Sequence, residues 1–123
     1  MSQFRNIERL FGVVNRRLFY VSSTLSYSRT LEALDRLAQE ILRTETDESV
    51  WNIGQFTGTC LDSLIVGAYW FLAENHGGQG SLEYRVLCRL GEIYKPGMTS
   101  GPEADTSEMD VYTAMGRLQC ETQ

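Results

Sequence analysis

The segment that decides the fold covers residues 50–73, with the sequence VWNIGQFTGTCLDSLIVGAYWFLA. Asp62 is its only charged residue, and Glu74 is the next one along the chain. A helix that is apolar on most of its faces is stable in water only when other helices cover it. We therefore expect a helix from near Val50 to Leu72 that other helices surround.

The same segment is long enough to cross a lipid bilayer. Small and polar residues cluster in its middle, at Thr57, Gly58, Thr59, Asp62 and Ser63. Residues of this kind are costly in a membrane and acceptable in a protein interior. We therefore interpret the segment as the core helix of a soluble protein and expect no transmembrane segment.

Amphipathic helices are predicted on both sides of this segment. Apolar residues recur every three or four positions from residue 4 to 21, from 31 to 42 and from 82 to 93, which is the period of one helix face. Residues 22–28 are rich in serine and predict a loop. No alternating pattern of strands is present. The predicted fold class is all-α, a compact helical bundle around one buried central helix.

The chain of 123 residues is long enough for one domain. Within it we expect a helical bundle core over residues 1–97, a mobile linker over 98–106 and a short C-terminal helix over 107–123. The linker prediction rests on small, polar and acidic residues, and the helix prediction on the spacing of Ser107 and Asp110.

Composition excludes several classes of function. The net charge of -5 opposes non-specific binding to nucleic acid. The three cysteines are widely spaced without a CxxC pair, which predicts neither a metal site nor a disulfide framework. We interpret Cys60 and Cys88 as small buried residues. His76, the only histidine, is expected on an exposed glycine-rich turn at residues 75–80. We predict no catalytic residues and no cofactor, and therefore no enzyme.

Asp62 admits two interpretations. A carboxylate in an apolar helix is costly unless it is paired, and arginine is its natural partner. An internal ion pair or an exposed position is one interpretation. The other is that Asp62 anchors a basic residue of a ligand.

Two neighbouring motifs resemble a known family. Residues 34–42, LDRLAQEIL, precede an acidic linker with Asp47, and Asn52-Ile53-Gly54-Gln55-Phe56 follows. This order is similar to the fourth helix and first homology motif of the Bcl-2 family of apoptosis regulators, in which Asn-Trp-Gly-Arg opens a buried central helix. Asn52 and Gly54 match that motif, while Ile53 and Gln55 depart from it. The chain is also short for the family, which implies a shortened, virus-encoded member.

The resemblance implies capture of an amphipathic homology-3 helix from a pro-apoptotic partner in a surface groove. By analogy, Leu37, Ile41 and Phe56 would line the groove, Gly54 would allow close approach, and Asn52 would hydrogen-bond the ligand. Gln55 replaces an arginine that forms an ion pair in the family, which implies weaker binding or a narrow range of ligands. The expected location is the cytoplasm, with association to mitochondria through partners.

A rival interpretation needs no family. A small acidic helical protein without catalytic residues is typical of an adaptor or an inhibitor of viral or phage type. Such a protein would act by protein–protein binding or by forming homo-oligomers through exposed apolar patches.

Overall fold

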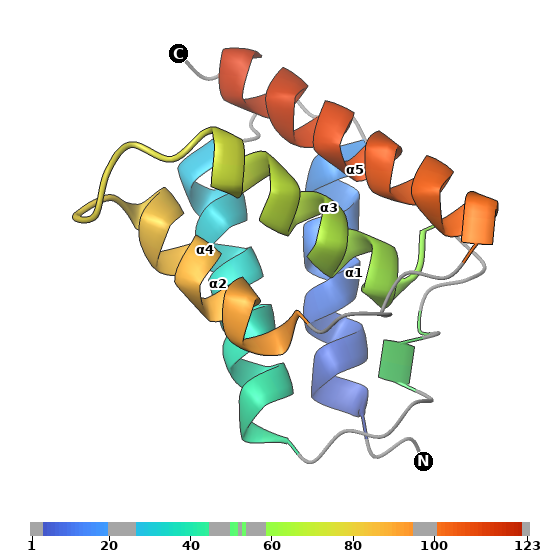
Figure 1. Cartoon of the computed structure of the whole chain (residues 1–123). Helices are drawn as coiled ribbons and strands as arrows, with labels where there is room; N and C mark the ends of the chain where they lie inside the picture. The colour runs from blue at the N-terminus through green and yellow to red at the C-terminus, as the bar shows by residue number, and fades with distance from the viewer. Residues whose placement is uncertain are drawn as a thin grey trace.

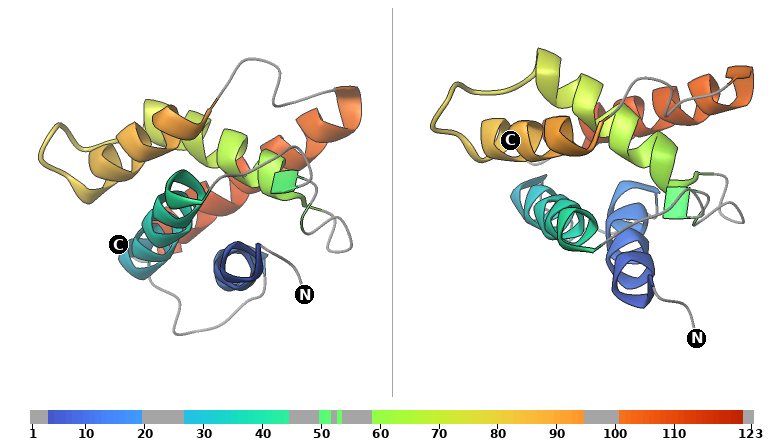
Figure 2. Two further views of the ribbon diagram at one scale, coloured as in Figure 1. Left: turned by 90° about the horizontal axis from the view of Figure 1, so that it is seen from below. Right: turned by 60° about the horizontal axis from the view of Figure 1, so that its bottom comes forward.

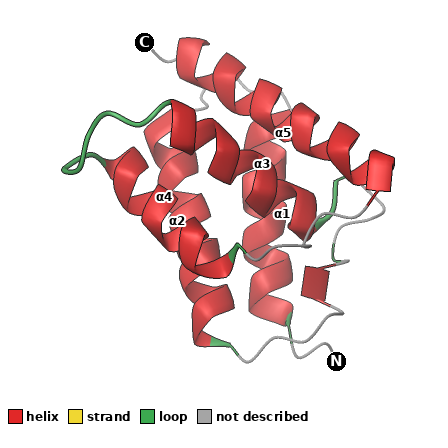
Figure 3. Ribbon diagram, in the orientation of Figure 1, coloured by secondary structure: helices red, strands yellow, loops and turns green. Residues whose placement is uncertain are grey.

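A computed structural model of the chain describes residues 4–19, 27–44, 50, 51, 53, 59–94 and 101–121, and for residues 101–109 and 121 it describes the backbone only. These parts form five helices and contain no strand (Figure 3). The helices are α1 (Arg5–Phe19), α2 (Tyr27–Arg43), α3 (Leu61–Glu74), α4 (Leu82–Ile93) and α5 (Gly101–Glu121). The predicted all-α fold class is confirmed.

The helices pack around one apolar interior. Helices α1 and α2 lie side by side, α4 packs against α2, and α3 packs against both α4 and α5 (Figures 1 and 2). Each of the five helices contributes buried apolar side chains to a single cluster. Apolar residues spaced every three or four positions lie on one face of a helix, and in this protein that face is turned to the interior.

Helix α3 is the most apolar of the five, but a fully enclosed central helix is not confirmed. Residues such as Leu61, Leu64 and Leu72 are fully buried, whereas the Trp70 side chain on the same helix is 48% exposed. One face of α3 therefore meets solvent. The other faces pack on α4, α5 and the interior.

The predicted start of this helix at Val50 is wrong, because α3 begins at Leu61. Cys60 has an extended backbone, and the Leu61 N–H donates to the Ile53 carbonyl at 2.9 Å, so the chain folds back before the helix starts. The threonines and the glycine at residues 57–59 are weak helix formers, which is consistent with this break.

Two other boundaries differ from the prediction. Helix α2 begins at Tyr27, inside the expected loop, and α5 begins at Gly101, so residues 101–106 of the expected linker are helical. Residues 98–100 lie outside the described residues. Pro102 fits a first helical turn, where a missing N–H is harmless. The α4 boundaries, Leu82 to Ile93, are confirmed.

Hydrogen bonds also join helices that are distant in sequence. The Tyr27 hydroxyl of α2 donates to Glu83 of α4 at 3.5 Å, and the Tyr112 hydroxyl of α5 donates to Glu74 at the end of α3. The Arg117 guanidinium donates to the Leu18 carbonyl at 2.7 Å. Arginine there satisfies a free carbonyl in the last turn of α1.

The turn between α3 and α4 is built from glycine and a serine cap. Gly78 has φ 106°, a conformation that glycine adopts without strain. The Ser81 Oγ accepts the Tyr84 N–H at 3.0 Å and donates to the Gly78 carbonyl at 2.8 Å. The expected helix-to-helix turn is thus confirmed.

Loss of this cap should destabilise the protein measurably. We expect Ser81→Ala to lower the free energy of unfolding by about 1 kcal/mol, because the Tyr84 N–H loses its acceptor, while the Gly78 carbonyl keeps only the backbone N–H of residue 81. Chemical denaturation monitored by circular dichroism measures the change. Ser28→Ala is the matched control, since Ser28 is exposed on α2. Equal stability of the two variants would contradict the role of the cap.

Candidate functional site

A buried ion pair joins α2 to α4. The Arg89 Nε donates to Asp35 Oδ1 at 2.6 Å, and the Gln39 side-chain amide donates to Asp35 Oδ2 at 2.9 Å. Asp35 is only 6% exposed. Asp35 lies off the apolar spacing of residues 31–42, which alone would place it at the surface, but α4 covers it.

Arg85 is held less tightly than Arg89. Its Nε lies 4.0 Å from Asp35 Oδ2, beyond hydrogen-bond distance, and its side chain is 59% exposed. Asp35 therefore anchors one arginine firmly and orients the second by charge. Both arginines belong to one face of α4.

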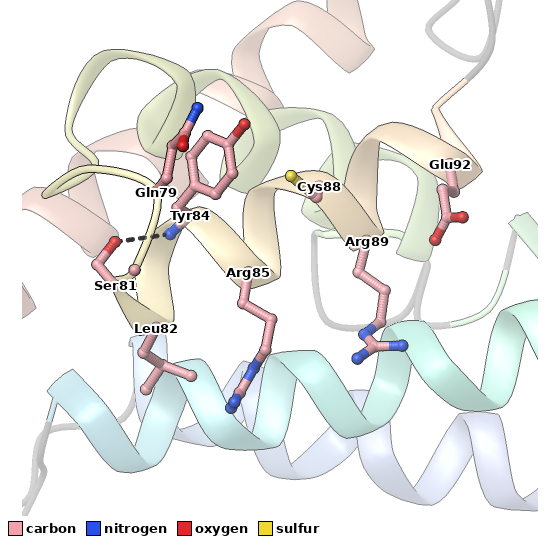
Figure 4. Close-up of a pocket in the computed structure, with 9 residues that line it drawn as sticks. Gln79, Ser81, Leu82, Tyr84, Arg85, Cys88, Arg89 and Glu92 are labelled. Carbon is pink, nitrogen blue, oxygen red and sulfur yellow. Dashed lines mark hydrogen bonds between the residues drawn. The ribbon is translucent and has the colours of Figure 1, made fainter.

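This face of α4 carries a hollow of about 650 Å³ (Figure 4). Arg85 and Arg89 extend from α4 toward α2, while Tyr84 and Gln79 point the other way. The full lining is Gln79, Gly80, Ser81, Leu82, Tyr84, Arg85, Cys88, Arg89 and Glu92. The hollow is open, shallow and mixed in polarity, which suits contact with a polypeptide surface better than enclosure of a small molecule.

An aromatic cluster joins α3 to the residue that follows α4. Tyr69 of α3 stacks on Tyr94, which follows α4, with ring centroids 5.0 Å apart. The Trp70 ring meets the Tyr69 ring edge to face at 5.7 Å. Trp70 contacts this stack through Tyr69 and exposes 48% of its surface to solvent. We call Tyr69, Trp70 and Tyr94 the aromatic face.

Asp62, in the first turn of α3, is the other unusual group on this helix. Its Oδ1 is buried and has no hydrogen-bond partner, and no ion pair forms with it in the described part of the chain. Burial raises the pKa of Asp62 to about 6. Among the described residues, the internal acid that pairs with arginine is therefore Asp35 and not Asp62.

The state of Asp62 predicts how stability depends on pH. Burial raises the folded-state pKa of Asp62 above its unfolded-state value. The contribution of the protonated group to stability is therefore complete below about pH 4 and is lost as pH rises through about 6. We expect Asp62→Asn to raise the free energy of unfolding at pH 7.5 by about 1 kcal/mol, after allowance for solvent screening of a half-exposed group. The gain should vanish at pH 4. Thermal unfolding at the two pH values measures it, and an equal effect at both would contradict the argument.

The residues that the resemblance proposed for a groove are only partly described. Leu37 and Ile41 are 0% and 4% exposed and belong to the core cluster. Asn52, Gly54, Gln55 and Phe56 lie outside the described residues. Leu37 and Ile41 lie together on the inner face of α2, where they pack against other helices.

His76, Cys88 and Cys120 are exposed, whereas Cys60 is partly buried. His76 is exposed, as expected, with its Nδ1 accepting the Gly78 N–H at 3.4 Å and its ring edge-on to Tyr84. Cys88 is exposed in the hollow, and Cys60 is partly buried with its Sγ 3.4 Å from the Ser63 Oγ. The prediction of a buried Cys88 is wrong, because residue 88 falls on the outer side of α4.

Two further structural observations concern metal ions and membranes. Among the described side chains, no three from His, Cys, Asp or Glu come together as ligands for a metal ion. None of the helices in the described ranges is both long and apolar enough to cross a membrane.

The sequence pattern missed the aromatic face. Trp70 lies in a segment that is apolar on nearly every face, so helical spacing alone does not indicate which side meets solvent. Tyr94 lies beyond the last periodic residue of α4. Comparison of the chain with protein-family models, with curated proteins and with solved structures finds no match in any of the three.

Proposed function

We propose that the protein acts by binding another protein, and that it captures an amphipathic helix of its partner on the outer surface of α3 and α4. The observation that carries this proposal is the exposure of Trp70, at 48%, beside a stacked pair of tyrosines. Tryptophan and tyrosine are enriched among the residues that dominate binding energy at protein interfaces.

The resemblance to the Bcl-2 family supports a finer proposal, an apoptosis inhibitor that sequesters a pro-apoptotic homology-3 helix. Under this proposal the protein acts in the cytoplasm and reaches mitochondria through its partners. A ligand would contact the buried Leu37 and Ile41 only after neighbouring helices had moved. Binding at the aromatic face requires no such opening, which favours this surface as the first contact.

Calorimetric titration with a panel of homology-3 peptides tests the proposal. We expect saturable, submicromolar binding of at least one peptide. Trp70→Ala should weaken that binding about 10- to 100-fold, as truncation of a dominant interface residue does. Leu42→Ala is the matched control, because Leu42 is also exposed, at 43%, but lies on α2. If none of the peptides binds to the folded protein, capture of a homology-3 helix is contradicted.

The exposed Trp70 also favours a second candidate, an adaptor that self-associates or binds a different protein target. Light scattering coupled to gel filtration distinguishes this adaptor from a protein that captures a homology-3 helix. An adaptor of this type should form a defined oligomer that Trp70→Ala converts to monomer, and it should not respond to homology-3 peptides.

A further inference from the structure

The hollow on α4 is lined by side chains that solvent reaches. Arg85, Cys88 and Glu92 follow one another at steps of three and four, which places them on one face of the helix, and all three are exposed. Ser81, one turn before Arg85, is partly exposed. A ligand therefore reaches this face of α4 without movement of any other described helix.

The hollow has more positive charge than its paired acid balances. Asp35 is the acid that faces Arg85 and Arg89, and it accepts a hydrogen bond from Arg89 alone. Glu92 also lines the hollow, but it forms no ion pair with either arginine in the described part of the chain. Two guanidinium groups beside one paired carboxylate leave one positive charge without a paired acid.

Arg85 has the donors that a ligand would use. Its side chain is 59% exposed, and its guanidinium, 4.0 Å from Asp35, makes no hydrogen bond within the described residues. A guanidinium carries five N–H donors in a planar fork that matches the two oxygens of a carboxylate. The charge of Asp35 draws the Arg85 side chain toward α2 (Figure 4). This orientation reduces the entropy that the side chain loses when it binds a ligand.

We propose that the hollow on α4 binds an acidic segment of a partner protein, with one carboxylate of that segment paired to the Arg85 guanidinium. Charge complementarity identifies the occupant, because an exposed cation in an open, partly polar hollow attracts an acidic chain. The net charge of -5 opposes the alternative occupant, a nucleic-acid strand. The site goes beyond the proposed function, since no residue of the aromatic face lines the hollow.

Cys88 is a local probe of occupancy. It is exposed in the same hollow, three positions after Arg85, whereas Cys120 is exposed on α5 and does not line the hollow. A bound peptide should shield the Cys88 thiol from iodoacetamide, a neutral reagent that alkylates cysteine and releases iodide. It should leave Cys120 accessible. Mass spectrometry of the digested protein measures the alkylation rate of each cysteine separately.

Two capped pentapeptides of glycine test the proposal, one with two glutamates and the other with two glutamines in their place. We expect the glutamate peptide, at millimolar concentration, to slow alkylation of Cys88 about threefold, because one exposed ion pair supports only weak binding. The glutamine peptide should not slow it. Arg85→Gln should abolish the protection. Arg36→Gln, which removes an exposed charge of α2 outside the hollow, should preserve it.

Three outcomes would overturn the inference. The first is equal protection of Cys88 by the two peptides or by neither, and the second is protection that survives Arg85→Gln. The third is stronger protection by a thymidine trinucleotide, whose two phosphates match the two glutamates in number, because a nucleic-acid strand would then be the better occupant. None of these outcomes bears on capture of a helix at the aromatic face, which the titration with homology-3 peptides tests.

Discussion

Replacement of Asp35 by alanine should cost about 3 kcal/mol of the free energy of unfolding, the lower part of the range for breaking a buried ion pair. The variant leaves the Arg89 guanidinium between α2 and α4 without its 2.6 Å partner and removes the acceptor of the Gln39 amide. Arg89 keeps 33% of its side chain exposed, so part of its charge remains solvated. A domain of this size should lose about 10 °C in melting temperature.

A double variant separates loss of the pair from loss of packing. Asp35→Leu combined with Arg89→Met replaces both charges by apolar groups, and its stability should lie within about 1 kcal/mol of wild type. Denaturant unfolding of the two variants beside wild type gives the comparison. A loss below 1 kcal/mol for Asp35→Ala would show that the pair does not hold α4 to α2.

Leu37→Ala should have a similarly large effect, about 2–5 kcal/mol, because Leu37 is 0% exposed within the core cluster. Leu42→Ala, on the same helix but 43% exposed, should change stability by less than about 0.5 kcal/mol. Urea unfolding at equal protein concentration measures both. A Leu37→Ala protein with wild-type stability would instead indicate that this side chain lines an open surface.

The inward faces of the helices could be predicted because burial repeats with the helical period. Leu31, Leu34, Leu37 and Ile41 form such a series, and all four are buried. Helix ends were harder to predict. The break before Leu61 depends on a hydrogen bond to the Ile53 carbonyl, and the spacing of apolar residues carries no information about that bond.

The candidate site could be predicted only in part, since it depends on contacts between distant residues. Asp35 has the sequence pattern of a surface charge, and only the packing of Arg89, which is 54 positions further on, makes it an internal one. Asp62 was recognised from its isolation in an apolar segment. The pattern did not indicate that Trp70 is exposed, because sequence spacing does not reveal which face neighbouring helices leave uncovered.

The proposed contact between the partner and Trp70 is tested most directly by the fluorescence of that tryptophan. The chain has two tryptophans, so Trp51→Phe leaves Trp70 as the only one. Titration of this variant with homology-3 peptides made without tryptophan should shift the emission of Trp70 to shorter wavelength, and the shift should saturate as its exposed ring is covered. Calorimetric binding of a peptide with no change in Trp70 emission would contradict the account and place the binding surface elsewhere on the protein.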